Sequence, residues 1–340
     1  MTLKPKRDIQ MFARAFRLIL PLAAAFFLAA SIGIPSVVLL AGPASAAAPF
    51  AKFQAPGFFR MMLGQFEVTA LSDGAVNLDV VKLLSEPAAD TEAALKASFL
   101  QNPLPTSVNA FVINTGRKLV LIDVGGGTFF GPGLGKLQSN LRAAGYAPEQ
   151  VDDILLTHMH RDHIGGLVFN GALAFPNATI HADKRESDFW LSNENLDKAP
   201  AAIKPRFQGA VAMLKPYIDA GRYQPFDRNI EIAPGVRSMA SYGHSAGHTT
   251  YAVESEGQAL WLIGDLIGVA AVQLQHPRVS IGFDGDADIA ADTREQLLRN
   301  ASQQGVLIGA AHLPFPGLGH IRAAGAAWNW LPIDTSLSAD

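Results

Sequence analysis

The sequence predicts an α+β fold in which β-sheets pack face to face and helices cover their outer sides. Two successive stretches of the chain are rich in short β-like runs, and each is closed by segments whose apolar residues recur at helical spacing. Of the 340 residues, 49% are hydrophobic and 17% charged, which is enough apolar material for a large core and argues against a disordered chain. We find no repeat of solenoid or propeller period.

The first of these stretches alternates β-like runs with helical patterns. Five short apolar runs predict strands at residues 66–71, 108–114, 119–123, 153–157 and 178–182. Helical spacing of apolar residues predicts helices at residues 88–101, 133–144, 184–192 and 204–220. Gly116 marks the turn between the second and third strands.

The second stretch repeats the pattern more briefly. Strands are predicted at residues 236–241, 249–254 and 259–264. A helix over 288–303, with Asp286 or Asp288 as its N-cap, precedes a last predicted strand at 305–310.

The N-terminal segment has the pattern of an export signal. Basic residues precede an uncharged stretch from Leu18 to Phe50, which ends in the small residues Ala44 to Ala48. We therefore predict a signal peptide at 1–48 that is cleaved to leave a single domain at 49–340. This domain would lie in the periplasm or outside the cell, with no stable membrane anchoring after cleavage. The alternative is a retained anchor, because the apolar run is long enough to span a bilayer.

Charge and cysteine content limit the partners and the chemistry. The whole chain has a formal net charge of -3, and the predicted cleavage makes it more acidic because mostly basic residues are removed. We therefore expect no nucleic-acid partner and favour a small, uncharged ligand. The absence of Cys excludes thiolate nucleophiles, Cys-ligated zinc and iron–sulfur clusters. Any metal must be bound by His and carboxylate side chains.

Four metal-capable side chains follow the predicted strand at 153–157. In an extended segment, His158 and His160 point to the same side, so both rings can reach one ion. Asp162 and His163 lie in the turn that follows and can approach a second position. A surface His cluster is the alternative, but it does not explain the apolar strand that leads directly into these residues.

This segment resembles the H-x-H-x-D-H motif of the metallo-β-lactamase-fold hydrolases. Residues 243–248 resemble the G-H-T-P-G-H segment of that family, although Ser245 and Ala246 depart from it. Asp265 and His312 each follow an apolar strand, as the remaining family ligands do. The resemblance implies a four-layer αββα sandwich.

The resemblance also implies a site for two divalent cations. Asp265 would bridge them and hold the nucleophilic hydroxide between them. Zinc suits these nitrogen and oxygen ligands, and manganese, cobalt or iron are alternatives. One ion would be bound by His158, His160 and His244, and the other by Asp162, His163 and His312.

Further polar residues receive supporting roles or structural ones. The resemblance places Asp123 beside a ligand, and His248 is expected to hydrogen-bond to the ligand shell. His320 either lines the site or anchors the C-terminal segment. For Asp73 we expect a turn-capping role.

Several segments outside the metal motifs resemble the methyl parathion hydrolases, which are secreted dizinc phosphotriesterases of this superfamily. That likeness implies a homodimer and an aromatic pocket formed by Phe130, Trp190 and Phe207, although buried aromatic rings are commonly core residues. A neutral aryl phosphotriester is therefore the expected substrate. Segments that carry the likeness are 58–64, 70–74, 189–192, 195–200, 268–273 and 312–317.

Gly268 separates this hypothesis from its alternatives. Quorum-quenching lactonases of the superfamily carry a Tyr three residues after the bridging Asp, where this chain has Gly268. The missing hydroxyl weakens the lactonase prediction, yet lactones and aryl esters remain the alternative substrates. A β-lactamase is less favoured, because no Lys or Arg is evident near the metal motifs for a substrate carboxylate. A non-catalytic metal- or ligand-binding protein is the lesser alternative.

Overall fold

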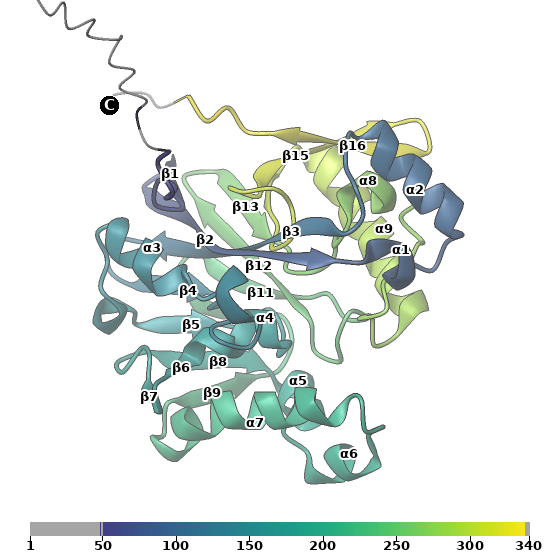
Figure 1. Cartoon of the computed structure of the whole chain (residues 1–340). Helices are drawn as coiled ribbons and strands as arrows, with labels where there is room; N and C mark the ends of the chain where they lie inside the picture. The colour runs from purple at the N-terminus through teal and green to yellow at the C-terminus, as the bar shows by residue number, and fades with distance from the viewer. Residues whose placement is uncertain (1–47, 49, 337–340) are drawn as a thin grey trace, which may run out of the picture. The chain divides into compact units, whose positions relative to one another are not determined.

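The structure is a computed structural model that describes residues 48 and 50–336. It contains two seven-stranded sheets, in the strand orders β1-β2-β3-β4-β5-β8-β9 and β10 through β16 (Figure 1). The strands of the first sheet are β1 (Phe58–Leu63), β2 (Phe66–Leu78), β3 (Leu104–Asn114), β4 (Leu119–Ile122), β5 (Asp153–Leu155), β8 (Thr179–Asp183) and β9 (Tyr223–Phe226). Those of the second are β10 (Glu231–Ala233), β11 (Val236–Ala240), β12 (Thr249–Ser255), β13 (Gln258–Leu262), β14 (Leu307–Gly309), β15 (Leu318–Ala324) and β16 (Ala327–Pro332).

Helices connect many of these strands. The short strands β6 (Val168–Phe169) and β7 (Ala172–Leu173) form a separate hairpin. The helices are α1 (Val80–Leu83), α2 (Ala88–Ala97), α3 (Leu137–Ala143), α4 (Arg161–Ile164), α5 (Lys184–Trp190), α6 (Asn193–Lys198), α7 (Lys204–Asp219), α8 (Ala270–Gln273) and α9 (Ala287–Gln304).

Alternation of side chains along the strands divides the core into layers. On β4, Val120 and Ile122 belong to the cluster between the two sheets, whereas Leu119 and Leu121 belong to the cluster under α3 and α7. On β13, Leu262 faces the other sheet and Trp261 packs in the cluster under α9. Because successive strand residues point to opposite faces, each sheet is covered on both sides. The predicted four-layer αββα sandwich is confirmed.

The loops that carry the predicted ligands meet at one edge of the sandwich. Strand β5 lies parallel to β4 and β8 in the first sheet, and β13 lies parallel to β14 in the second. Strand β11 runs in the same direction as β13, because both pair antiparallel with β12. The loops after β5, β11, β13 and β14 therefore leave from the carboxyl ends of their strands, where ligands bind in open α/β sheets.

Most predicted elements are present with shifted ends. Gly131–Gly133 forms a 3-10 turn and Gly135 has a φ of +86°, so α3 begins only at Leu137 instead of at residue 133. Strand β2 continues beyond the predicted end through a bulge near Gly74. Asp286 is the N-cap of α9, where its carboxylate accepts a hydrogen bond from the N–H of Ile289. No sequence pattern predicts strands β1, β6, β7, β9, β10, β15 and β16 or the short helices α1, α4, α6 and α8.

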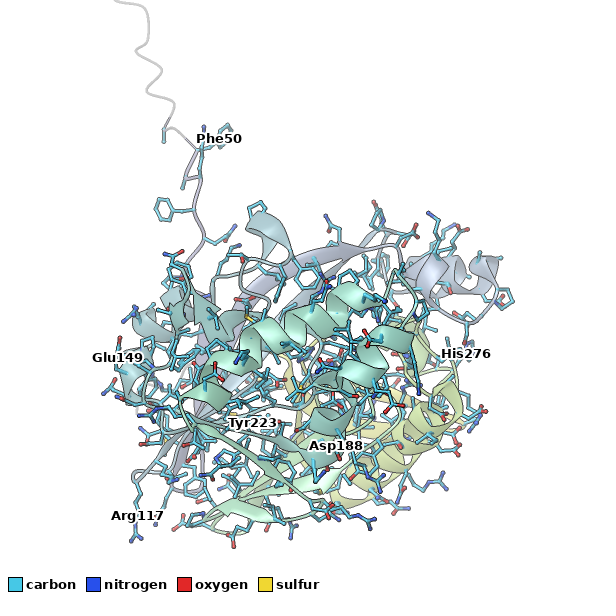
Figure 2. All side chains as sticks on the ribbon, turned by 90° about the horizontal axis from the view of Figure 1, so that it is seen from below. Phe50, Arg117, Glu149, Asp188, Tyr223 and His276 are labelled. Atoms are coloured by element: carbon cyan, nitrogen blue, oxygen red, sulfur yellow. The ribbon has the colours of Figure 1, made fainter. Side chains whose placement is uncertain are left out.

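The predicted signal peptide lies outside the described residues apart from residue 48, so cleavage and export remain predictions. Within the described part of the chain, none of the helices has the length and hydrophobicity needed to cross a bilayer. Figure 2 shows charged side chains such as Arg117 and Glu149 pointing outward at the periphery.

Candidate metal centre

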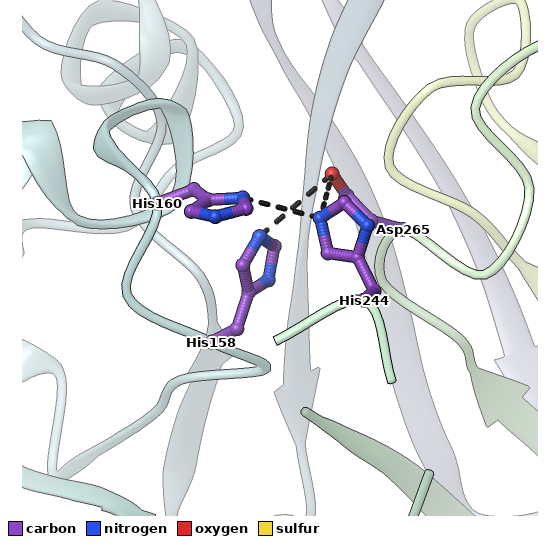
Figure 3. Close-up of side chains that lie close together, drawn as sticks. All are labelled: His158, His160, His244 and Asp265. Atoms are coloured by element: carbon purple, nitrogen blue, oxygen red, sulfur yellow. Dashed lines mark hydrogen bonds and ion pairs between the residues drawn. The ribbon is translucent and has the colours of Figure 1, made fainter. Parts of the chain in front are cut away.

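The structure brings all seven predicted ligands together at the shared edge of the two sheets. His158 lies in the loop that leaves β5, and His160 is the N-cap of α4. His244 follows β11, and Asp265 follows β13. The side chains of these four residues converge on one point (Figure 3). Asp162, His163 and His312 converge with Asp265 on a second point, so the two groups share this carboxylate as the resemblance implies.

The distances within the first group fit a tetrahedral ion. Nε2 of His244 lies 3.1 Å from Nδ1 of His160 and 3.3 Å from Oδ2 of Asp265. Nε2 of His158 lies 3.7 Å from the same oxygen. Ligand atoms roughly 2.1 Å from a tetrahedral zinc ion lie about 3.4 Å from one another. The four ligand atoms therefore stand at the separations that such an ion requires.

The second group has comparable dimensions. Nε2 of His163 lies 3.0 Å from Oδ1 of Asp265 and 3.6 Å from Oδ2 of Asp162. Nε2 of His312 lies 3.5 Å from Oδ2 of Asp162. The two carboxylate oxygens of Asp265 therefore face both groups, although Oδ2 also approaches His312 at 3.0 Å.

Three buried polar atoms of the centre make no hydrogen bond with any described residue. They are Nε2 of His158, Nε2 of His163 and Oδ1 of Asp265. Buried polar atoms are rarely left without a partner, because each one costs about 1–3 kcal/mol. A divalent cation at each group would satisfy all three, so the residues present fit two metal ions. Their role as ligands remains a prediction.

The side chains of the centre differ in the charge state that their surroundings favour. Burial and the neighbouring His163 hold the pKa of His158 well below its usual range. Burial also opposes protonation of His244, but Asp265 and Asp284 outweigh it and raise the pKa of His244 to about 9. Burial would raise the pKa of Asp265, yet the surrounding histidines, led by His163, hold it well below its usual range. Protons and metal ions therefore compete for the same atoms.

Each of four histidines is held through its other ring nitrogen, Nδ1. Asp123 accepts hydrogen bonds from Thr157 and lies 2.8 Å from Nδ1 of His163, so it contacts a ligand as expected. The corresponding Nδ1 contacts are His158 with Thr157 Oγ1 (3.0 Å), His244 with Asp284 Oδ1 (2.8 Å) and His312 with the carbonyl of Ser107 (2.8 Å). Such contacts fix the ring orientation and the tautomer that faces a metal.

Sequence reasoning missed two carboxylates that support the centre. Asp284 lies in a loop before α9, and nothing in the surrounding sequence marks it. Glu186 on α5 is 1% exposed and joins the two ligand loops. Its Oε1 accepts the N–H of Met159, and its Oε2 accepts the N–H of Gly247 and the hydroxyl of Ser245, all at 2.7–2.8 Å. The hydroxyl of Ser245, which the Thr of the family motif also carries, thus helps to hold the loop of the first group.

Of the other predicted residues, His248 contacts the centre, and the structure decides the role of His320 and corrects the expected role of Asp73. Nε2 of His248 accepts the backbone N–H of Asp265 at 3.2 Å, and burial lowers the pKa of His248 to about 3. His320 is exposed on β15 and contacts the carbonyl of Val306, so of the two roles left open for it, lining the site is excluded. The reason is that β15 runs antiparallel to β14 and carries His320 to the opposite end of that strand. Asp73 lies within β2 and accepts three backbone N–H groups from the loop before α3, so it does not cap a turn of its own.

A cavity opens beside the centre, and we call it the edge cavity because it lies at the shared edge of the two sheets. Phe130 and Gly268 line it as predicted, together with apolar side chains from β2 and the segment after α8. Phe207 is 2% exposed and packs against Trp190 inside the core, so its assignment to the pocket is wrong. Trp190 is itself largely buried; its ring lies 5.5 Å from that of His160 and borders a neighbouring cavity. The apolar lining comprises Val76, Leu78, Phe130, Ile281 and Phe283.

Two arginines also line the edge cavity, although no Lys or Arg for a substrate carboxylate is evident in the sequence near the metal motifs. Arg161 lies inside the ligand motif, between His160 and Asp162. Arg206 comes from the first turn of α7. The sequence could not indicate where either side chain points, because neither belongs to a pattern with a known direction.

The fold and the paired ligand groups are those of the metallo-β-lactamase superfamily, and the profile of this superfamily matches residues 103–312. The chain belongs to this superfamily. A crystal structure of "hydrolase AbOPH in beta lactamase superfamily" is 34% identical, with a TM-score of 0.80 over 83% of this chain and 99% of that one. AidC, a dizinc quorum-quenching lactonase crystallised with a product, is 28% identical, with a TM-score of 0.75 over 82% and 98%.

Curated relatives match a shorter stretch. An N-acyl homoserine lactonase of Bacillus cereus is 29% identical over 154 residues, which is 45% of this chain. An atrochrysone carboxyl ACP thioesterase of Passalora fulva is 30% identical over 150 residues, which is 44% of this chain and 34% of that protein. The matched stretch spans about half (53%) of the length of the B. cereus lactonase.

Proposed function

We propose that the protein is a dinuclear metal-dependent hydrolase that cleaves lactones or related carboxylic esters. The observation that carries this proposal is the pair of ligand groups that share Asp265 at the floor of an open, largely apolar cavity. The lactonases among the similar proteins support the lactone class. The resemblance of the sequence segments favours phosphotriesters, with lactones as the alternative, whereas the similar proteins favour lactones.

The reaction consumes one water: the acyl C–O bond breaks, the acyl carbon gains an oxygen, and the alcohol leaves with a proton. Two cations, when bound, would polarise the carbonyl and lower the pKa of the attacking water. Asp265 contacts both groups, His163 through Oδ1 and His244 through Oδ2, and so would help to hold both ions. Val76, Leu78 and Ile281 provide apolar surface for the acyl or aryl part of the substrate.

Phosphotriester hydrolysis is a second candidate, and Gly268 favours it. A Cβ built at Gly268 would meet only Ile281 and Gln273, at 3.5 and 3.7 Å, which is ordinary van der Waals contact. The position could therefore hold a larger residue, and its emptiness widens the cavity. A wider cavity without a hydroxyl suits a bulky tetrahedral phosphotriester better than a planar lactone, which would use that hydroxyl as a hydrogen-bond partner.

The deciding measurement is the ratio of kcat/KM for an aryl-fused lactone to that for an aryl dialkyl phosphotriester. Both substrates are assayed on one zinc-reconstituted preparation of residues 49–340. We expect a ratio well above one, with His158→Ala and Asp265→Ala losing bound metal and activity together. A ratio well below one would favour the phosphotriesterase. A preparation that binds two metals yet cleaves neither substrate would support a binding protein on this fold.

A further inference from the structure

Two positively charged side chains line the edge cavity without an ionic partner among the described residues. Neither Arg161 nor Arg206 forms an ion pair or a side-chain hydrogen bond with any residue in the described part of the chain. Both side chains are only partly exposed. Other arginines that are at least as buried are paired: Arg294, for example, donates hydrogen bonds to the carbonyls of Leu266, Pro277 and Val279.

Aromatic rings and a glycine fix the position of Arg161. Its guanidinium carbon lies 5.6 Å from the ring centre of Phe129 and 5.5 Å from that of Phe130. A Cβ built at Gly209 of α7 would approach the Arg161 stem at 3.2 Å, so the glycine leaves room for this stem. Gly209 stands one helical turn after Arg206, and α7 therefore brings the two arginines to the same wall.

Arg206 is held in a similar way. Its guanidinium carbon lies 5.6 Å from the ring centre of Phe283. Burial and the nearby Arg161 lower the pKa of Arg206, which is the effect expected of a cation beside a like charge. Asp162 is the acidic group that offsets this, and its carboxylate is already assigned to the second ligand group. The wall therefore keeps positive charge that a bound anion could neutralise.

We propose that Arg161 and Arg206 determine specificity by binding a carboxylate on the substrate, so that the enzyme prefers anionic esters or lactones over neutral ones. This inference rests on the proposed esterase function and narrows its substrate class. It also changes the expectation of a neutral aryl substrate. Arginine suits this role because its planar guanidinium donates paired hydrogen bonds to a carboxylate, while its face stacks on aromatic rings.

The kinetic test compares two substrates that differ mainly in charge, 3-acetoxybenzoate and 3-acetoxybenzamide. Each kcat/KM is divided by the hydroxide-catalysed rate of the same ester. In zinc-loaded wild-type protein we expect the anion to be preferred by about tenfold or more. Arg161→Gln and Arg206→Gln should each remove most of this preference, because they lower kcat/KM for the anion far more than for the amide. Arg237→Gln is the matched control, because Arg237 is an exposed residue of β11 paired with Glu254.

A binding test separates this proposal from the esterase proposal. Isothermal titration calorimetry compares 3-methoxybenzoate with 3-methoxybenzamide on metal-free protein, where no cation can bind the carboxylate. We expect only the anion to bind measurably, and either Gln variant to weaken it by about tenfold or more. If wild-type protein binds both compounds equally, or the variants bind the anion as wild type does, the specificity proposal is overturned. If the protein binds the anion selectively but hydrolyses neither ester, the specificity proposal is retained and the esterase proposal is rejected.

Discussion

Asp284 and Asp123 provide a matched pair of substitutions, because each orients one histidine of a different ligand group. Asp284 Oδ1 lies 2.8 Å from Nδ1 of His244, in the first group. Asp123 Oδ2 lies 2.8 Å from Nδ1 of His163, in the second. We predict that Asp284→Asn selectively weakens metal binding by the first group. Asp123→Asn should selectively weaken metal binding by the second group.

The size of the effect follows from the contacts. Asparagine keeps an acceptor oxygen for the ring N–H, so the hydrogen bond survives but the negative charge does not. A hydrogen bond to a charged group contributes about 1.5–3 kcal/mol, against about 0.5–1.5 kcal/mol for a neutral one. The difference of about 1–1.5 kcal/mol corresponds to roughly five- to tenfold weaker metal binding, at the lower end of the range for partners of metal-bound histidines.

The assay is competitive titration of metal-free protein with zinc in the presence of a chromophoric chelator, which resolves two binding steps. Cobalt loading then identifies the weakened position, because ring N–H protons of histidines bound to cobalt give shifted NMR signals. His244 should lose its signal first in Asp284→Asn, and His163 first in Asp123→Asn. Asp292→Asn, at an exposed residue of α9, is the control. Wild-type affinity for both ions in both variants would refute the reasoning.

Three further predictions concern stability and specificity. Glu186→Ala should lower the free energy of unfolding in urea by about 3 kcal/mol, because three buried donors lose their acceptor, and an unchanged midpoint would contradict this. Gly268→Tyr should shift the kcat/KM ratio about tenfold toward lactones by narrowing the cavity and adding a hydroxyl; an unchanged ratio would exclude Gly268 as a determinant. Burial opposes ionisation of Asp153, but His181 and Lys118 outweigh it and lower its pKa. Asp153→Asn should therefore destabilise the protein by about 1 kcal/mol at pH 7, a difference that shrinks in urea titrations as the pH falls below 3.8; a constant difference would argue against the ion pairs.

The ligand set was predictable because its chemistry is concentrated in short segments. His158 and His160 follow a buried strand, and strand geometry alone puts both rings on one side. Asp284 and Glu186 could not be found in this way, since each acts across a long sequence separation through a single side chain in an unremarkable segment. The role of His320 could not be decided, because its spacing from His312 says nothing about the direction of the next strand.

The sandwich was predictable for a similar reason, and its edges were not. The nearly continuous apolar runs of β4 and β13 are typical of strands that are covered on both faces. Strands β1 and β16 lie at sheet edges, and most of their residues are partly exposed, which weakens the alternation that sequence reading depends on.

The shared edge of the two sheets has a consequence for how the protein would unfold. The first group combines histidines from the β5 loop with His244 and Asp265, which follow strands of the other sheet. An ion bound there ties the two halves together in the manner of a cross-link. Separating the sheets would require both ions to leave first, so saturating metal should slow unfolding as well as shift its equilibrium. Metal supply would then set the lifetime of the folded chain in the presence of proteases, independently of any substrate.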